Sequence, residues 1–369
     1  MAQRLPVMSG SKTLYDIVFS QSFDDLLFDL EELNVQNRKV MIVTDSNVRS
    51  LYADAVVNLL ADKCKKCEVF AFEAGEEHKT LDTVKDAYKA LIEAGFDRKD
   101  LLIALGGGVV GDVTGYIAAT YLRGVDFVQI PTTLLAQADS SIGGKTGVDF
   151  DGYKNMVGAF KMPKLVYMNL ATLQTLDERQ FFNGFAEIMK HGMIKDAGFY
   201  EWLISNMYEI CEREMDVLEE MIMHSCSIKK AVVEKDPLEQ GDRALLNFGH
   251  TIGHAIEKAK GFELLHGECV ALGCVAAAFI SYKKEMISAE EFYEIRDMFV
   301  PFYLPITVED IVPEEIVTLT KSDKKMEAGK IKFVLLKKIG KAVIDNTVTE
   351  EELLEAVKEI HFGEEDMMA

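Results

Sequence analysis

Short apolar runs of strand type alternate with longer amphipathic runs of helical type in the first half of the chain, and this pattern constrains the fold more than any other. The runs that favour strands are 40–44, 69–72, 101–105 and 127–130. The runs that favour helices are 48–61, 81–94 and 109–121. Alternation of this kind is typical of a mostly parallel sheet with helices on both faces. We therefore expect an α/β N-terminal domain built on such a sheet.

The pattern changes after about residue 176, where helical periodicity dominates. The helical segments are 178–194, 199–211, 217–233, 245–258 and 269–283. Two β-like runs, 331–336 and 342–345, flank Gly340 and predict a small hairpin. We expect an α/β domain over 1–177, a mostly α-helical domain over 178–369, and a frayed tail over 364–369.

Composition excludes several classes of function. The chain has 369 residues and a formal net charge of −21, from 40 basic and 61 acidic side chains. Such a charge does not attract phosphate backbones, so no nucleic acid is expected as a partner. The apolar runs are shorter than the ~20 residues of a membrane-spanning helix, and residues 1–11 lack the apolar core of a secretory signal. We expect no membrane association.

The six cysteines do not form a disulfide framework in a chain of this length. We therefore expect a reducing, cytoplasmic setting. Cys64 and Cys67 form a lone C-x-x-C pair, and a zinc site would need a second pair. This pair is expected to be structural or incidental.

A glycine turn lies between a predicted strand and a predicted helix, with the sequence GGGVVGD over 106–112. Gly106, Gly108 and Gly111 fit the G-x-G-x-x-G pattern, which lets a pyrophosphate approach the N-terminus of a helix. The turn follows the third strand, however, whereas the usual motif follows the first. Asp126 lies 20 residues further on, but it begins a strand. A dinucleotide site and a tight structural turn both remain open on this motif alone.

Three histidines form a second signal. His250 and His254 are four residues apart, so a helix would place them on one face, and His266 follows a predicted turn at Gly261. Asn247 and Arg243 precede them at intervals of one turn and extend a polar stripe. A polar stripe among apolar neighbours requires water, a ligand or a metal. A divalent metal site and a solvated face are the two alternatives.

Two further groups are ambiguous by themselves. Glu187 and Lys190 are three residues apart and could be an ordinary surface pair. Lys145, Lys154 and Asn155 lie near glycines and could cradle a phosphate or a carboxylate, or could belong to a flexible basic loop. The loop is not a P-loop, because Asp139 occupies the position of the first glycine.

Four segments together resemble the 3-dehydroquinate synthase family, over roughly residues 39–345. They are GGGVVGDVTG (106–115), QIPTTLLAQADSSIGGKTGV (129–148), KNMVGAF (154–160) and RALLNFGHTIGHAIE (243–257). The resemblance implies an N-terminal, Rossmann-like NAD-binding domain and a C-terminal helical domain. It also implies an NAD- and divalent-metal-dependent lyase of the shikimate pathway, which leads to chorismate and the aromatic amino acids.

The implied reaction converts 3-deoxy-D-arabino-heptulosonate 7-phosphate to 3-dehydroquinate and phosphate. In the family, NAD oxidises one ring hydroxyl, which acidifies the neighbouring C–H bond and allows phosphate elimination. The ketone is then reduced again, the ring opens, and an intramolecular aldol step closes the carbocycle.

The resemblance assigns residues to each part of this chemistry. The metal, zinc or cobalt, would be bound by Glu187, His250 and His266. His254 would transfer protons. The other substrate-contacting positions, which suit an anionic sugar phosphate, are Asp139, Lys145, Asn155, Lys190, Lys229, Arg243, Asn247 and either Lys324 or Lys325. Lys230 is adjacent to Lys229, and the spacing to Asp236 favours Lys229.

The residues implied for NAD lie at several separate positions. They are Asp45, Asn47, Glu76, Lys79, Gly107, Gly108, Val109, Asp112, Thr132, Thr133, Lys145, Lys154, Thr172, Thr175 and Leu176. An acid at the end of a strand, such as Asp45, suits the adenosine ribose hydroxyls and disfavours a 2′-phosphate. The acid therefore precedes the glycine turn here.

Arg123 is implied to reach the substrate phosphate of the neighbouring subunit in a homodimer. The other interpretation is an arginine that interacts with the C-terminal end of its helix. Relatives that make other rings, above all 2-deoxy-scyllo-inosose synthase, are the main alternative. Asn247 argues against that enzyme, whose members carry an acid there. Metal-dependent alcohol dehydrogenases lack the Arg243 and Asn247 stripe, and a non-catalytic binding module would not need His254 and Lys190.

Overall fold

The computed structural model describes residues 2–239, 241–321, 326–327 and 330–363. The chain divides into two compact units, Met1–Leu176 and Asp177–Ala369. The division falls one residue before the boundary expected from the sequence. None of the described helices is both long enough and apolar enough to cross a membrane.

The first unit is built on a seven-stranded sheet with the order β1-β2-β9-β6-β5-β3-β4. Its strands are β1 (Gln3–Ser9), β2 (Lys12–Ser20), β3 (Lys39–Asp45), β4 (Lys66–Phe72), β5 (Leu101–Gly106), β6 (Asp126–Pro131) and β9 (Leu165–Asn169). β1 and β2 pair antiparallel, and the other neighbouring strands pair parallel. The mostly parallel α/β sheet predicted from the alternation is confirmed.

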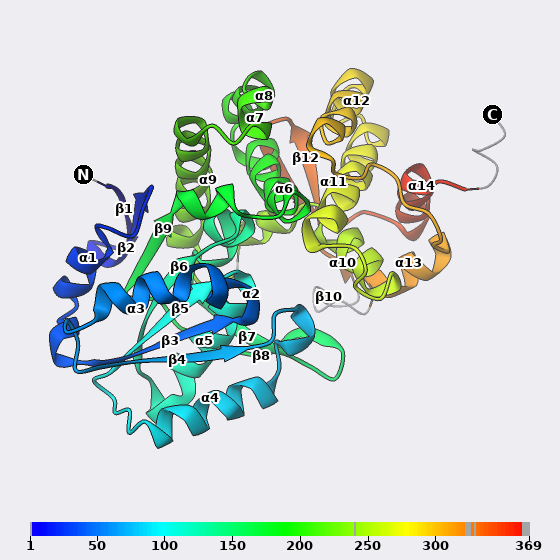
Figure 1. The fold of residues 1–369 in the computed structure, drawn as a ribbon. Helices are drawn as coiled ribbons and strands as arrows, with labels where there is room; N and C mark the ends of the chain where they lie inside the picture. The colour runs from blue at the N-terminus through cyan, green and yellow to red at the C-terminus, as the bar shows by residue number, and fades with distance from the viewer. Residues whose placement is uncertain (1, 240, 322–325, 328–329, 364–369) are drawn as a thin grey trace. The chain divides into compact units, whose positions relative to one another are not determined.

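Helices cover both faces of this sheet (Figure 1). They are α1 (Leu26–Glu32), α2 (Ser46–Val48), α3 (Asp54–Leu60), α4 (Leu81–Glu93) and α5 (Gly108–Thr120). Successive side chains of β3 point to opposite faces. Val40 and Ile42 join the core that contains α3, whereas Met41 and Val43 join the core that contains α4 and α5.

The structure adds elements to the first unit that the sequence patterns did not indicate. β1, β2, β9 and α1 are among them, and the segment treated as a possible flexible loop forms the hairpin of β7 (Lys145–Phe150) and β8 (Tyr153–Phe160). The helix expected over 48–61 is divided by a π-helical turn, Arg49–Ala53, between α2 and α3.

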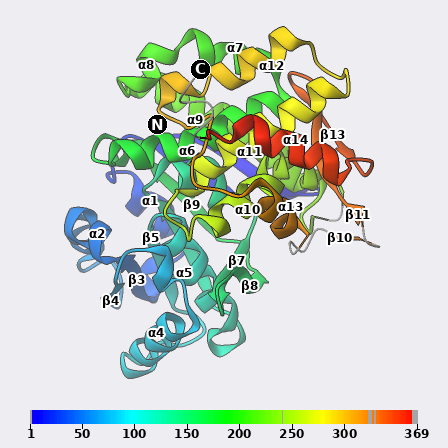
Figure 2. The same ribbon diagram turned by 90° about the vertical axis from the view of Figure 1, so that its right-hand side faces the viewer.

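The second unit is mostly helical, as expected. Its helices are α6 (Glu178–Lys195), α7 (Ala197–Ser205), α8 (Met207–Cys211), α9 (Met215–Lys235), α10 (His250–Ala259), α11 (His266–Lys283), α12 (Ala289–Asp297), α13 (Pro313–Thr320) and α14 (Glu350–Ile360). α11 is buried along most of its length and packs against α6, α10 and α14 (Figure 2). The predicted hairpin is confirmed as β12 (Phe333–Lys338) and β13 (Lys341–Asp345), and β10 (Met326–Glu327) pairs with β11 (Lys330–Ile331). The expected frayed tail lies outside the described residues.

Two helical predictions for this unit were wrong in part. The segment 199–211 is two helices that meet at Asn206. The segment 245–258 is not one helix: a 3-10 turn, Asp242–Asn247, ends before α10 begins at His250. Gly249 separates them with φ +79°, a backbone conformation that favours glycine. Arg243 and Asn247 therefore do not share an α-helical face with His250 and His254.

Candidate functional site

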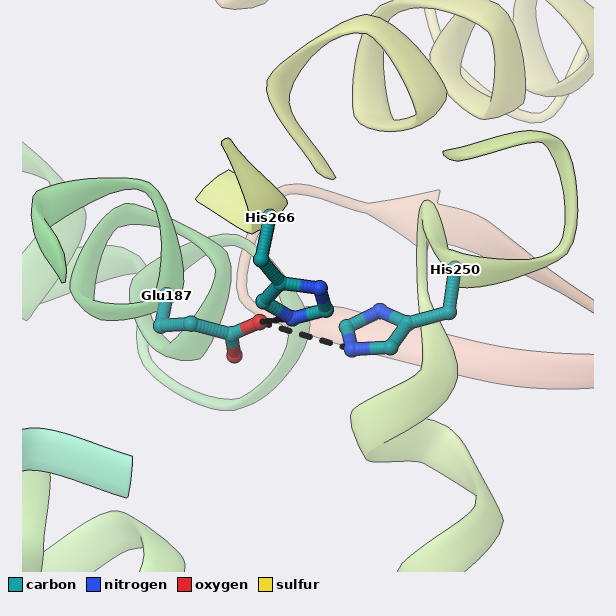
Figure 3. Close-up of side chains that lie close together, drawn as sticks. All are labelled: Glu187, His250 and His266. Atoms are coloured by element: carbon teal, nitrogen blue, oxygen red, sulfur yellow. Dashed lines mark ion pairs between the residues drawn. The ribbon is translucent and has the colours of Figure 1, made fainter. Parts of the chain in front are cut away.

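Three potential metal ligands converge in the second unit. Glu187 lies in the middle of α6, His250 is the first residue of α10, and His266 is the first residue of α11. Nε2 of each histidine lies 3.4 Å from Oε1 of Glu187. Figure 3 shows the carboxylate and the two rings pointing toward one another. The structure thus brings together the three residues that the family resemblance implied as ligands.

The donor set fits a divalent cation. Oε1 of Glu187 is buried and has no hydrogen-bond partner among the described residues, although two ring nitrogens face it. An unsatisfied buried carboxylate oxygen is costly. A cation held by this oxygen and the two Nε2 atoms would remove that cost, and zinc and cobalt both accept one carboxylate with two imidazoles.

Successive turns of α6 contact successive residues at the start of α11. Arg179 donates two hydrogen bonds to the Glu268 carboxylate, at 2.6 and 2.8 Å. One turn later, Oδ1 of Asn183 accepts the N–H of Gly267 at 2.5 Å. Glu187, one turn further, faces His266. Residues four apart share one face of a helix, so these contacts fix where Glu187 and His266 meet.

The charges around the cluster favour an ionised glutamate. Glu187 and Lys190 are both 1% exposed and form an ion pair on α6. Burial acts to raise the pKa of Glu187, but Lys190 and His266 outweigh burial and hold that pKa well below its ordinary value. The interpretation of Glu187 and Lys190 as an ordinary surface pair is therefore wrong.

His254 belongs to the same group of imidazoles. Its ring centroid lies 5.2 Å from that of His250 and 5.8 Å from that of His266. Unlike Glu187, His254 is only partly buried. It therefore lies beside both histidines of the candidate ligand set.

Arg243 and Asn247 lie in the 3-10 turn that precedes α10, and each donates a hydrogen bond to the segment just before that turn. Arg243 is 3% exposed and donates from Nη1 to the carbonyl oxygen of Pro237 at 2.8 Å. Asn247 donates to Glu239 at 3.0 Å. The 3-10 turn that carries both residues packs against α6 and α9.

Lys229 lies on α9 and is 5% exposed. Its neighbour Lys230 pairs with Glu234, with an N–O distance of 3.4 Å. A lysine is rarely buried unless its ammonium is paired. Lys229 is thus the more buried of the two neighbouring lysines, and its contact with a substrate stays a prediction.

The residues expected to bind NAD gather at one edge of the sheet in the first unit. Parallel strands bring their carboxyl ends to the same edge, which is where α/β sheets bind ligands. The expected residues follow these ends in turn: Asp45 and Asn47 after β3, Glu76 and Lys79 after β4, 107–112 after β5, Thr132 and Thr133 after β6, and Thr172, Thr175 and Leu176 after β9. Gly107 is the N-cap of α5, where free N–H groups can bind a phosphate.

Two glycines of the turn also have packing roles. A Cβ at Gly106 would lie 2.5 Å from a methyl carbon of Val110, and one at Gly111 would lie 2.8 Å from Oε1 of Gln129. The glycine turn can therefore be a tight structural turn and also leave the N-terminus of α5 open to a phosphate.

Lys79 contacts several polar side chains at this edge of the sheet. It is 4% exposed and donates to Asp112 and to Oδ1 of Asn155, both at 2.7 Å. Burial acts to lower the pKa of Lys79, but Asp112 and Glu76 outweigh burial and raise it. Lys154 joins the group through Glu76, at 3.4 Å. The ammonium of Lys79 thus ties the β7–β8 hairpin to α5.

Several other polar residues at this edge carry structural contacts. Oδ1 of Asp45 caps α2 by accepting the N–H groups of Asn47 and Val48, both at 2.9 Å. Thr175 pairs with the hydroxyl of Tyr52, and Thr172 accepts a hydrogen bond from the fully buried Gln137 at 3.2 Å. The sequence patterns gave no reason to single out Gln137 or Tyr52.

Three further residues expected at the site lie in the first unit, in a strand or in short helical turns. Lys145 begins β7 and is exposed, Asp139 is partly buried in a π-helical turn, and Arg123 is exposed in a 3-10 turn, where its φ is +68°. Lys324 and Lys325 lie outside the described residues.

Comparison with protein families gives two adjoining matches. The model described as "3-dehydroquinate synthase N-terminal" matches residues 69–183, and the model described as "3-dehydroquinate synthase C-terminal" matches residues 184–326. Together they cover more than half of the chain.

Individual relatives agree with these matches. The chain is 48% identical over 319 residues to a 3-dehydroquinate synthase of Acetivibrio thermocellus, which covers 86% of this chain and 89% of that protein. It is 44% identical to a 3-dehydroquinate synthase of Thermoanaerobacter pseudethanolicus, over 93% of this chain and 97% of that protein.

Solved structures share the fold along nearly the whole chain. One is 2-epi-5-epi-valiolone synthase from Streptomyces hygroscopicus with NAD+ and Zn2+ bound, at 28% identity and a TM-score of 0.87, covering 97% of this chain and 99% of that one. Another is 2-deoxy-scyllo-inosose synthase complexed with carbaglucose-6-phosphate, NAD+ and Co2+, at 24% identity and a TM-score of 0.86, covering 97% of this chain and 100% of that one.

Proposed function

The chain belongs to the 3-dehydroquinate synthase family, and from this premise we propose which of its residues perform the reaction of that family. The enzyme is an NAD- and metal-dependent lyase that converts 3-deoxy-D-arabino-heptulosonate 7-phosphate to 3-dehydroquinate and phosphate. The observation that carries the assignment of residues is the convergence of Glu187, His250 and His266 in the second unit.

Glu187, His250 and His266 would hold the divalent metal. A bound zinc or cobalt ion supplies Lewis-acid polarisation of a substrate oxygen and lowers the pKa of a hydroxyl there. One carboxylate and two imidazoles leave coordination positions open for such oxygens. Lys190 pairs with Glu187 and keeps its carboxylate ionised for this role.

The residues at the carboxyl edge of the first unit's sheet would hold NAD. When bound, NAD supplies the transient oxidation of a ring hydroxyl and its later re-reduction. The N-terminus of α5 would offer free N–H groups to the pyrophosphate, and Asp45 would accept from ribose hydroxyls with the carboxylate oxygen that does not cap α2. Lys79 holds Asp112 and Asn155 in place while NAD binds.

The substrate is a dianionic phosphate that also carries a carboxylate, so it requires cations. Arg243 can bind a carboxylate with two parallel hydrogen bonds, and Lys229 adds a second buried cation on α9. Asn247 contributes a neutral amide, and His254 would take or return a proton at a ring nitrogen. Asp139, Lys145 and Asn155 complete the proposed contacts from the first unit.

The proposal includes a homodimer in which Arg123 completes the site of the neighbouring subunit. Arg123 is exposed and makes no hydrogen bond or ion pair with the described residues of its own subunit. A guanidinium in this state is available to a phosphate supplied from elsewhere. We also place the enzyme in the cytoplasm, which agrees with its six free cysteines.

A direct assay tests the function. The protein is incubated with the heptulosonate phosphate, NAD and zinc, while phosphate release is followed and the product is identified by NMR. We expect 3-dehydroquinate in step with phosphate. Formation of a deoxy-inosose from glucose 6-phosphate, with no turnover of the heptulosonate phosphate, would contradict the proposal and favour a different cyclase.

A further inference from the structure

Glu257 is a buried acid at an unfavourable position. It lies in the last turn of α10, and its side chain is 3% exposed. Burial removes the water that stabilises a carboxylate, and the C-terminal end of a helix carries partial negative charge. The Glu257 backbone already helps to close the helix, because its carbonyl oxygen accepts the N–H of Phe262 at 3.0 Å. The side chain has no part in that backbone contact.

The carboxylate of Glu257 faces the histidine that begins α11. Its Oε2 lies 3.9 Å from Nδ1 of His266, while Nε2 of the same ring lies 3.4 Å from Oε1 of Glu187. The ring therefore has a carboxylate at each nitrogen. At 3.9 Å the Glu257 contact is longer than a hydrogen bond, so it acts on the ring electrostatically.

His250 shows the same arrangement with a different group. Its Nδ1–H donates to the carbonyl oxygen of Phe248 at 3.1 Å, and its Nε2 faces Glu187. A neutral imidazole has one N–H and one lone pair, so a group that attracts the proton to Nδ1 leaves the lone pair on Nε2. At His250 that group is a backbone carbonyl, and at His266 it is Glu257.

We propose that Glu257 is a positioning residue for the metal site: it keeps the proton of His266 on Nδ1 and turns the Nε2 lone pair toward the metal. Acidic partners of this kind orient histidine ligands and make them more basic. The inference rests on the proposed function, because it requires a metal between Glu187, His250 and His266. His254 is the other imidazole near this acid, since ligand atoms of His254, Glu257 and His266 all lie within 4.8 Å of one another. The experiment must therefore separate an effect on the metal from an effect on His254.

The test compares metal affinity in Glu257→Gln and Glu263→Gln. Both variants remove one negative charge, but Glu263 is exposed and makes its contact with Arg179 through the backbone. The full-length protein is stripped of metal and titrated with zinc against a chromogenic chelator, and then with cobalt by its visible absorption. We expect Glu257→Gln to weaken zinc and cobalt binding by about 10- to 100-fold, and Glu263→Gln to bind as the wild type does.

Stability of the metal-free protein distinguishes positioning from a structural role. Glu257→Gln removes both a charge buried near the C-terminal end of α10 and its electrostatic contact with His266, and these two effects oppose each other, so the thermal midpoint of the metal-free variant should stay close to that of the wild type. A structural role would lower that midpoint.

Each outcome decides a separate question. If the wild type binds no zinc, the proposed metal site is wrong and the inference falls with it. If the wild type binds zinc and Glu257→Gln binds equally well, only the inference is overturned. A shifted pH profile with unchanged metal affinity would instead assign Glu257 to His254, and a lowered metal-free midpoint would assign it to folding. Either result overturns the positioning role.

Discussion

Gly273 of α11 packs directly against Gly249, so that a Cβ at position 273 would lie 1.8 Å from the Gly249 carbonyl oxygen. Gly249 in turn leaves no room for a side chain, because its own Cβ would lie 2.8 Å from the backbone nitrogen of Cys274. The backbones of the two segments therefore meet without intervening side chains. His250 follows Gly249 directly, so this contact helps to fix the position of a candidate metal ligand.

Gly273→Ala should destabilise the second unit, although alanine is a better helix former than glycine. We expect a cost of about 2 kcal/mol or more, because the new methyl group forces α10 and α11 apart. Gly198→Ala on α7 is the matched control: its Cβ meets only Asp196 Oδ1, at 3.4 Å, so we expect a gain of up to about 1 kcal/mol. Urea unfolding followed by the fluorescence of Trp202, the single tryptophan, measures both. Equal effects of the two substitutions would refute the packing argument.

His250→Ala should remove the metal without unfolding the protein. One of three ligands is lost, while the backbone contacts around Gly249 remain. The measurements are bound zinc after dialysis, phosphate release, and the thermal midpoint of the metal-free protein. His361→Ala, which changes a histidine outside the cluster, should keep both zinc and activity. Full activity in metal-free protein would show that the cluster is not catalytic.

NAD should act as a catalyst that is not consumed. Since the same cofactor oxidises and then reduces the substrate, many phosphates should be released per NAD, and absorbance at the NADH wavelength should not grow steadily. The check is to follow phosphate and absorbance together at substoichiometric NAD. Growth of the NADH signal in step with phosphate would identify a simple dehydrogenase instead.

Asp126 should contribute stability that depends on pH. Burial acts to raise its pKa, but a 2.8 Å hydrogen bond from Arg38 and the charge of Lys164 outweigh burial and lower that pKa below the ordinary value of 3.8. A carboxyl whose pKa is lowered by folding stabilises the fold above its unfolded pKa, and this contribution is lost as the pH falls through the folded pKa.

Asp126→Asn should therefore cost about 1 kcal/mol at pH 7, and the difference from the wild type should shrink below about pH 4. Urea unfolding followed by circular dichroism at several pH values measures this. Asp86→Asn, at an exposed position on α4, should show no such difference. A cost that stays constant down to pH 2 would contradict the ion-pair explanation. NAD affinity should not change in Asp126→Asn, because Asp126 lies at the amino end of β6, away from the carboxyl edge.

Arg123 should act in the neighbouring subunit. We expect Arg123→Ala and His254→Ala to be inactive separately and to regain activity when mixed under conditions of subunit exchange. The mixed dimer then has one doubly defective site and one intact site. No recovery despite demonstrated exchange, or full activity of Arg123→Ala alone, would exclude the shared site.

The sequence by itself determined the class of fold and the types of residue available for chemistry. The strands β3 and β5 contain continuous apolar runs, and β6 is apolar apart from Asp126 and Gln129, because both faces of a central parallel strand are buried. They could be predicted for that reason. β1, β2 and β9 could not, because their pairing joins residues that are far apart in the chain, such as Ile17 and Val166.

The tertiary structure decided which of the candidate groups meet. Local periodicity predicted one helix over 245–258. In the structure α10 begins only at His250, after Gly249, which packs closely against α11. Lys79 bridges Asp112 and Asn155 across separations of 33 and 76 residues, and Glu257 faces His266 from another helix. Spacing along the sequence reports only neighbours within a few turns of one element. Contacts between elements follow from how whole faces pack, and no local pattern contains that information.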